Sequence, residues 1–254
     1  MRLIDTHCHL NDRKAFPDPV AAVEESFAAG VEKLIVVAVD TEWSQIALDL
    51  ADQFEGVYAV VGWHPSHSAQ YNPAELKKIE AMLKHPKALA VGEIGLDYHW
   101  DYATKEQQFA CLHDHLALAE STGKPVVFHC REAYSDLLDL LESRPVLPYL
   151  FHCWAGTREE AQRVLDLGGY LGVDGPLTYA KADDTRAQFA SFPHDRILIE
   201  TDAPWMTPVP FRGQRNKMAY LPFVNSALAK CWGVTEEESA QITWDNAHRF
   251  FRIP

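Results

Sequence analysis

The chain has 254 residues, with 36 Asp and Glu against 23 Lys and Arg, and a formal net charge of −13 at pH 7. This acidic balance excludes a protein that coats DNA through a broad basic face, and a hydrophobic content of 47% excludes a disordered chain. The longest apolar runs, such as residues 34–39, are far shorter than the roughly 20 residues of a membrane span, so we expect no membrane segment.

Apolar, β-branched runs recur along the chain with helical segments between them. Such continuous runs are typical of parallel strands that are buried on both faces. We predict strands near residues 2–9, 33–39, 57–63, 88–94, 125–130, 149–153, 169–174 and 196–202.

The segments between these strands have helical spacing. One apolar stripe follows the i, i+3, i+4, i+7 pattern at Tyr134, Leu137, Leu138 and Leu141. Two more helices, near 217–231 and 235–250, are expected to close the chain. Eight strand–helix units predict a single α/β domain over residues 1–254, folded as a (β/α)8 TIM barrel, and a doubly wound open sheet is the alternative.

Ionisable side chains stand where five of the predicted strands end. In a barrel these ends meet on one face, where active sites form. Burying so many polar groups there would be costly without a metal ion or a charged partner. The candidates for a metal site at the C-terminal face of the strands are His7, His9, Glu93, His129, His152 and Asp202.

This set suits two divalent cations, with Glu93 as the candidate bridging ligand. Imidazoles favour Zn²⁺ whereas carboxylates favour Mg²⁺ or Mn²⁺, so the identity of the metal stays open. Two ions held by four neutral imidazoles and two carboxylates keep a positive charge, which explains how an acidic protein could hold phosphate. Such a centre activates a water molecule and stabilises both the attacking and the leaving oxygen.

The five cysteines form no C-x-x-C pair, and three of them directly follow a histidine. Neighbours on a strand point to opposite faces, so we interpret these three thiols as packing groups rather than ligands. Free thiols favour a reducing compartment, and we expect a cytoplasmic protein.

The strand-end motifs together resemble the TatD family of metal-dependent deoxyribonucleases, which belongs to the metallo-dependent hydrolase barrels. The resemblance runs from Ile4 to Asn246. In chain order the motifs read DTHCH at 5–9, GEIGLD at 92–97, FHCR at 128–131, HCWAG at 152–156, ETDAP at 200–204 and RGQRN at 212–216.

The resemblance implies a role for each ligand. One metal would be held by His7, His9 and Asp202, with Glu93 bridging, and the second by His129 and His152. Asp202 and Glu93 would be the catalytic residues, with Asp202 taking a proton from the attacking water. The implied activity is phosphodiester hydrolysis in DNA, often from the 3′ end.

Four further residues are candidates for substrate binding. His64 and Arg131 end predicted strands, and each could equally have a structural role. Arg212 and Arg215 follow the eighth strand, where barrels often bind phosphate. Three departures from the family pattern bear on substrate preference rather than on metal binding: Trp154-Ala155 after His152, Met218, and Trp205 where Tyr is frequent.

Three functions were weighed. The first is a two-metal 3′–5′ exonuclease that cleaves single-stranded or frayed DNA. For this function we expect neither membrane association nor an obligate protein partner. The second is a hydrolase of ester or amide substrates, such as D-aminoacyl-tRNA or a small molecule. The third is a non-catalytic barrel, which the complete ligand set argues against.

Overall fold

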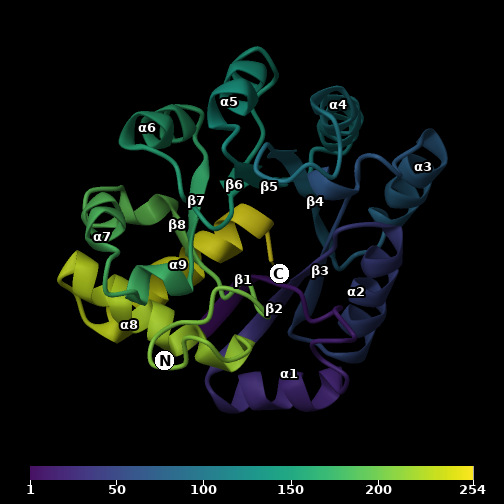
Figure 1. The fold of residues 1–254 in the computed structure, drawn as a ribbon. Coiled ribbons are helices and arrows are strands. Elements are labelled where there is room, and N and C mark those ends of the chain that lie inside the picture. The colour runs from purple at the N-terminus through teal and green to yellow at the C-terminus, as the bar shows by residue number, and fades with distance from the viewer. Residues whose placement is uncertain (254) are drawn as a thin grey trace. The chain divides into compact units, whose positions relative to one another are not determined.

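The computed structural model describes residues 1–253. Within them, eight strands alternate with helices and follow one another in the sheet order β1-β2-β3-β4-β5-β6-β7-β8 (Figure 1). The strand pairs β1–β2, β3–β4, β4–β5, β5–β6 and β6–β7 are parallel. A doubly wound sheet would permute this order, so the prediction of a (β/α)8 barrel is confirmed.

The strands are β1 (Leu3–Cys8), β2 (Val31–Val37), β3 (Val57–Val61), β4 (Ala88–Asp97), β5 (Val126–Arg131), β6 (Tyr149–Phe151), β7 (Tyr170–Val173) and β8 (Ile197–Ile199). The α-helices are α1 (Pro19–Ala28), α2 (Thr41–Gln53), α3 (Pro73–Met82), α4 (Lys105–Thr122), α5 (Tyr134–Glu142), α6 (Arg158–Asp166), α7 (Asp183–Phe189), α8 (Leu221–Trp232) and α9 (Glu236–Phe251). Short 3-10 turns are η1 (Pro65–His67), η2 (Gly175–Thr178), η3 (His194–Arg196) and η4 (Met218–Tyr220). No helix within residues 1–253 is long and apolar enough to cross a membrane.

The chain forms two compact units. The central unit comprises residues 37–171, and the terminal unit comprises residues 1–36 and 172–254. In the central unit, α2, α3, α4 and α5 lie outside strands β3 to β6 (Figure 1). The predicted stripe of α5 is buried at all four positions, and every residue of β4 is buried. The residues that the apolar pattern assigned to the core of this unit are therefore buried.

In the terminal unit, the first and last strands meet. The amide of Asp202 donates to the carbonyl of His7 at 2.9 Å, and the amide of His9 donates to the carbonyl of Ala203 at 2.8 Å. Helix α9 packs against both β1 and β8. These bonds fix the segments that follow the two strands.

Strands β4 and β5 approach closely at a glycine. Gly95 has a φ of +141°, and a Cβ there would overlap the carbonyl oxygen of His129. Gly95 pairs with His129 in the strand register, and β4 continues to Asp97, beyond its predicted end at residue 94. The missing side chain thus lets β4 run alongside the part of β5 that carries His129.

Because this approach leaves no room for a methyl group, Gly95→Ala is expected to lower the free energy of unfolding by on the order of 3 kcal/mol. Gly123→Ala is the matched control, because Gly123 also has a positive φ of +64° but no atom lies within 4 Å of an added Cβ. The control is expected to cost about 1 kcal/mol. Chemical denaturation measures both, and equal losses would contradict the steric argument.

Candidate metal centre

A first cluster of ligand groups lies in the terminal unit, at the end of β1 and in the segment after β8. The Nε2 atoms of His7 and His9 are 3.2 Å apart. Oδ1 of Asp202 lies 3.4 Å from Nε2 of His9 and 3.9 Å from Nε2 of His7. All three residues are buried, and they form one of the groups able to hold a metal ion.

A buried carboxylate supports this cluster from below. Asp5 accepts hydrogen bonds from the amide and the hydroxyl of Thr201, at 2.9 and 2.6 Å, and from the amide of His7 at 3.3 Å. Burial raises the pKa of Asp5 to about 8, although these hydrogen bonds oppose the rise. Asp5 thus ties the end of β1 to the segment that carries Asp202.

Trp205 borders the same cluster. Its ring meets that of His9 edge to face, with centroids 5.0 Å apart and an interplanar angle of 70°. The indole is 49% exposed, so it stands between a predicted ligand and solvent.

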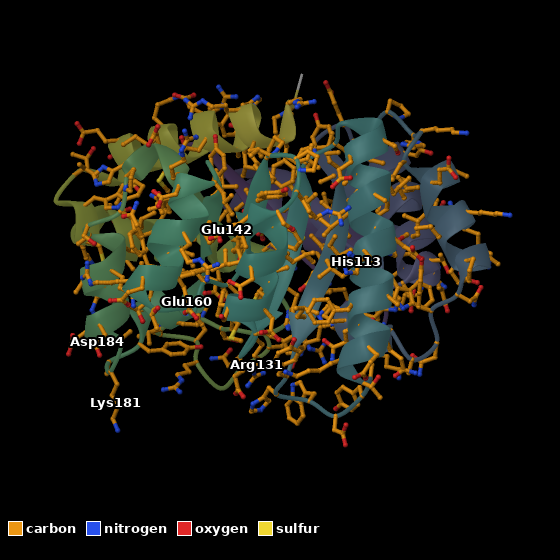
Figure 2. All side chains as sticks on the ribbon, turned by 90° about the horizontal axis from the view of Figure 1, so that it is seen from above. His113, Arg131, Glu142, Glu160, Lys181 and Asp184 are labelled. Carbon is orange, nitrogen blue, oxygen red and sulfur yellow. The ribbon has the colours of Figure 1, made fainter. Side chains whose placement is uncertain are left out.

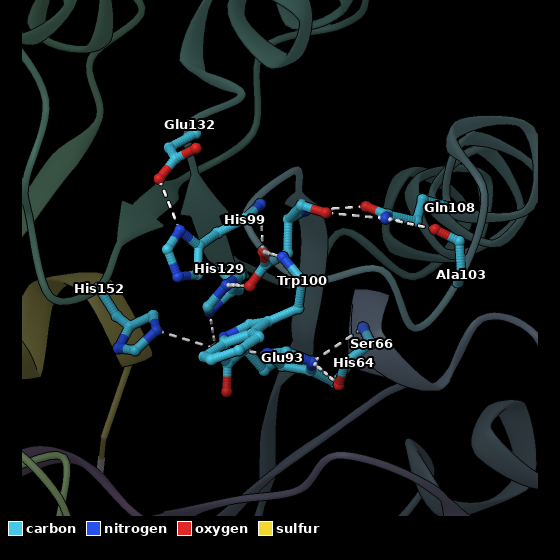
Figure 3. A network of polar contacts seen from close by, with 11 residues as sticks. His64, Ser66, Glu93, His99, Trp100, Ala103, Gln108, His129, Glu132 and His152 are labelled. Atoms are coloured by element: carbon cyan, nitrogen blue, oxygen red, sulfur yellow. Dashed lines mark hydrogen bonds and ion pairs between the residues drawn. The ribbon is translucent and has the colours of Figure 1, made fainter.

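A second cluster lies in the central unit around Glu93, which is 2% exposed (Figure 3). Its Oε1 lies 2.8 Å from Nε2 of His152, 3.0 Å from Nδ1 of His129 and 3.5 Å from Nε2 of His64. One buried carboxylate oxygen is therefore shared by three imidazoles: that of His129 lies within β5, and those of His64 and His152 follow β3 and β6.

A second carboxylate fixes the ring of His129. Oδ2 of Asp97 accepts from Nε2 of His129 at 2.8 Å. Burial alone lowers the pKa of His129, but its hydrogen bonds to Asp97 and Glu93 outweigh burial and raise it. The two carboxylates thus favour positive charge at this place, which is the preference that a cation site requires.

Gln108 was missed as a site residue. Its side chain interrupts the apolar stripe of α4, accepts from the amide of Asp97 at 2.8 Å and donates to the carbonyl of Asp97 at 2.8 Å. A polar glutamine among the mostly apolar residues that α4 buries is the signal that could have identified it, although His115 is also buried on this helix.

The donor sets of both clusters fit divalent metals. Each brings imidazole nitrogens together with a buried carboxylate oxygen, a combination that suits Zn²⁺ or other divalent transition metals. The carboxylate that accepts from His129 is the usual partner of a metal-ligating histidine, because it sets the orientation of the ring. The residues that the sequence predicts as ligands thus group as His7 with His9 and Asp202, and as Glu93 with His129 and His152.

His64 could contact substrate or bind metal. Its Nε2 faces Glu93, and its Nδ1 contacts Oγ of Ser66 at 2.7 Å. Burial lowers the pKa of His64 to about 4, although Glu93 opposes the shift, so the ring is neutral at pH 7. A neutral ring can contact substrate or bind metal.

His64→Ala is expected to lower kcat roughly 10²-fold, as for loss of a positioned polar group, with metal content unchanged. Elemental analysis beside steady-state kinetics measures both quantities. Loss of one metal equivalent would contradict the substrate-binding role and make His64 a ligand. His67→Ala, which changes a neighbouring half-buried ring, is the control.

The other predicted substrate-binding residues are exposed arginines. Arg131 ends β5 and lies at the lower edge of Figure 2, away from His113 and Glu142 on the helices. Arg212 lies over the ring of Tyr179, with 4.2 Å from Cζ to the centroid. Arg215 donates to the carbonyl of Ala15 at 2.5 Å and so also braces its loop.

Asn216, which ends the same motif as Arg212 and Arg215, is fully buried. Its amide nitrogen donates to the carbonyls of Thr201 and Trp205, at 2.7 and 2.6 Å. Asn216 therefore holds the loop after β8 in place.

Barrel topology and ligand groups at the strand ends define a metal-dependent hydrolase, and comparison with known proteins agrees. Residues 4–252 match the family model described as TatD related DNase. The chain therefore belongs to the TatD family, as its motifs predict.

Curated relatives match over almost their whole length. The chain is 36% identical over 253 residues to the uncharacterized metal-dependent hydrolase YabD of Bacillus subtilis strain 168, covering 99% of each chain. It is 32% identical over 261 residues to the 3′-5′ ssDNA/RNA exonuclease TatD of Edwardsiella piscicida, covering 99% of this chain and 100% of the relative. Among solved structures, the TatD homolog YjjV of Escherichia coli K12 has a TM-score of 0.94 at 33% identity, covering 100% of this chain and 99% of that one.

Proposed function

We propose that this metal-dependent hydrolase is a 3′–5′ exonuclease acting on single-stranded or frayed DNA. The observation that carries the proposal is the convergence of His64, His129 and His152 on one buried oxygen of Glu93. The Edwardsiella piscicida relative, named an ssDNA/RNA exonuclease, supports the choice of substrate.

In this proposal the two clusters serve one centre for two divalent cations, Mg²⁺, Mn²⁺ or Zn²⁺. His7, His9 and Asp202 would hold one ion, His129 and His152 would hold the other, and Glu93 would be a ligand of both. The proposal is supported by the topology, because these residues lie at or near the ends of strands of one barrel, and the carboxyl ends of barrel strands converge on one face. When bound, such ions activate water for attack and offset the charge that develops on the phosphate.

The residues of the chain supply position and proton transfer. The carboxylate of Asp202 accepts the proton of the attacking water. His64 and Arg131 contact the phosphate next to the bond that breaks, and Arg212 and Arg215 contact phosphates further along the strand.

A strand end can enter a barrel mouth more readily than an intact duplex, which favours single-stranded or frayed ends. The formal charge of −13 predicts affinity that is modest and falls with salt. The proposal includes the cytoplasm as the site of action, because all five cysteines are free thiols and suit a reducing compartment. It requires no protein partner.

The test is cleavage of single-stranded DNA carrying a 5′ label, by protein stripped of metal and reloaded with Mg²⁺, Mn²⁺ or Zn²⁺. We expect a metal-dependent ladder that shortens from the 3′ end, and no ladder after chelation. Absence of cleavage with every ion, despite bound metal, would overturn the proposal and point to ester or amide substrates such as D-aminoacyl-tRNA.

A further inference from the structure

The loop of residues 98–104, between β4 and α4, carries two exposed aromatic rings. Trp100 is 48% exposed and Tyr102 is 60% exposed. Their ring centroids lie 5.9 Å apart with an interplanar angle of 24°, so the rings form one stacked aromatic surface. Scattered single apolar side chains are normal on a protein surface, whereas contiguous exposed apolar surface is where interaction sites are found.

The loop is held in place by the same carboxylate that fixes His129. Oδ1 of Asp97 accepts from the amides of His99 and Trp100, at 2.9 and 3.2 Å, while its Oδ2 accepts from His129. Gln108 donates to the carbonyl of Ala103 at 3.1 Å, near the other end of the loop. The aromatic surface is therefore anchored to the second cluster and not borne on a loose loop.

Arg131 adds a positive charge beside this surface. Its Cζ lies 5.7 Å from the centre of the Trp100 ring, and its guanidinium has no carboxylate partner among residues 1–253. The ring of His99 also contacts the ring of Trp100 edge to face, with centroids 4.7 Å apart and an interplanar angle of 89°. In the view of Figure 3, the indole of Trp100 overlaps Glu93, and His129 is seen just above it.

We infer that the aromatic surface of Trp100 and Tyr102 binds single-stranded nucleic acid by stacking on its bases, with Arg131 at a phosphate. Stacking needs only the flat face of a base, so this surface would accept any sequence, and the arginine supplies a positive charge for the backbone phosphate. The inference rests on the proposed function, because it names how the substrate of that site is held.

The test compares wild-type protein, W100A/Y102A and the conservative W100F/Y102F on an end-labelled octamer of thymidine and on the same octamer with abasic sites. Because stacking on an aromatic ring contributes to the free energy of binding, W100A/Y102A is expected to raise KM for the thymidine octamer roughly 10-fold, with kcat nearly unchanged. W100F/Y102F is expected to restore most of the affinity. Wild-type protein on the abasic octamer is expected to resemble W100A/Y102A, and combining both changes is expected to add little more.

Phe27→Ala is the matched control, because Phe27 is 37% exposed on α1 and has no part in the proposal. An unchanged KM for W100A/Y102A would overturn the inference. So would an equal rise in KM on the thymidine and abasic octamers, because the rings would then act without the bases.

Fluorescence anisotropy of a labelled octamer with protein stripped of metal by a chelator measures binding without cleavage. It therefore separates the proposed aromatic surface from the proposed exonuclease activity. Binding that depends on the rings, together with no cleavage under any ion, would support the aromatic surface and overturn the exonuclease. Neither binding nor cleavage by wild-type protein would overturn both. A wild-type dimer that W100A/Y102A converts to a monomer, seen by sedimentation, would show that the rings bind a second copy and would overturn the inference.

Discussion

Glu93→Gln is expected to lower kcat/KM by at least roughly 10³-fold while the barrel stays folded. The side chain is 2% exposed, and one of its oxygens contacts three imidazoles at 2.8 to 3.5 Å. Glutamine keeps the volume of the side chain but removes the negative charge, so the change tests the proposed bridging ligand without opening a cavity. Steady-state cleavage of single-stranded DNA, with metal content measured beside it, checks the prediction.

Glu80→Gln is the control for this experiment. It is the same chemical change, but Glu80 is exposed on α3 and is not one of the predicted ligands. We expect the control to keep wild-type kinetics. Full activity in Glu93→Gln would show that the bridging assignment is wrong.

Asp202→Asn is expected to be comparably severe, with a loss of roughly 10³-fold in kcat. Asp202 supplies the carboxylate of the His7–His9 cluster, and we propose that it also accepts the proton from water. Its φ is +52°, a left-handed conformation that asparagine tolerates better than alanine, so this variant tests chemistry rather than backbone strain.

Metal affinity and rate together measure the role of Asp202. We expect metal binding to weaken roughly 10-fold to 100-fold, less than the rate falls, because asparagine keeps one ligand oxygen but cannot accept the proton. Asp184→Asn, an exposed change on α7, is the control. A fall in rate no larger than the fall in metal occupancy would argue against proton transfer by Asp202.

The sequence predicted the fold because its main signals are local. Apolar runs marked every strand, and the four-residue stripe of α5 is buried as its period required. Strand ends were less predictable, because they depend on neighbours. A glycine at position 95 reads as a break, yet β4 continues through it, since the absence of a side chain lets β5 come close.

The candidate site was predictable in its residue types and less so in their partners. The ligands stood out as polar groups at the ends of apolar runs. His9 lies outside β1, which ends at Cys8, so the close approach of its ring to that of His7 depends on the loop after the strand. Gln108 and Asn216 act through backbone groups distant in sequence, and no local pattern encodes such contacts.

The hydrogen bonds between the end of β1 and the segment after β8 have a consequence for the order of events during synthesis. They join His7 to Asp202 and His9 to Ala203, so these contacts close a loop of nearly the whole chain and form only after the ribosome has passed residue 203. The central unit is continuous in sequence, and all its internal contacts are available once residue 171 has emerged. The imidazoles around Glu93 can therefore gather on the nascent chain well before the N-terminal histidines gain their carboxylate.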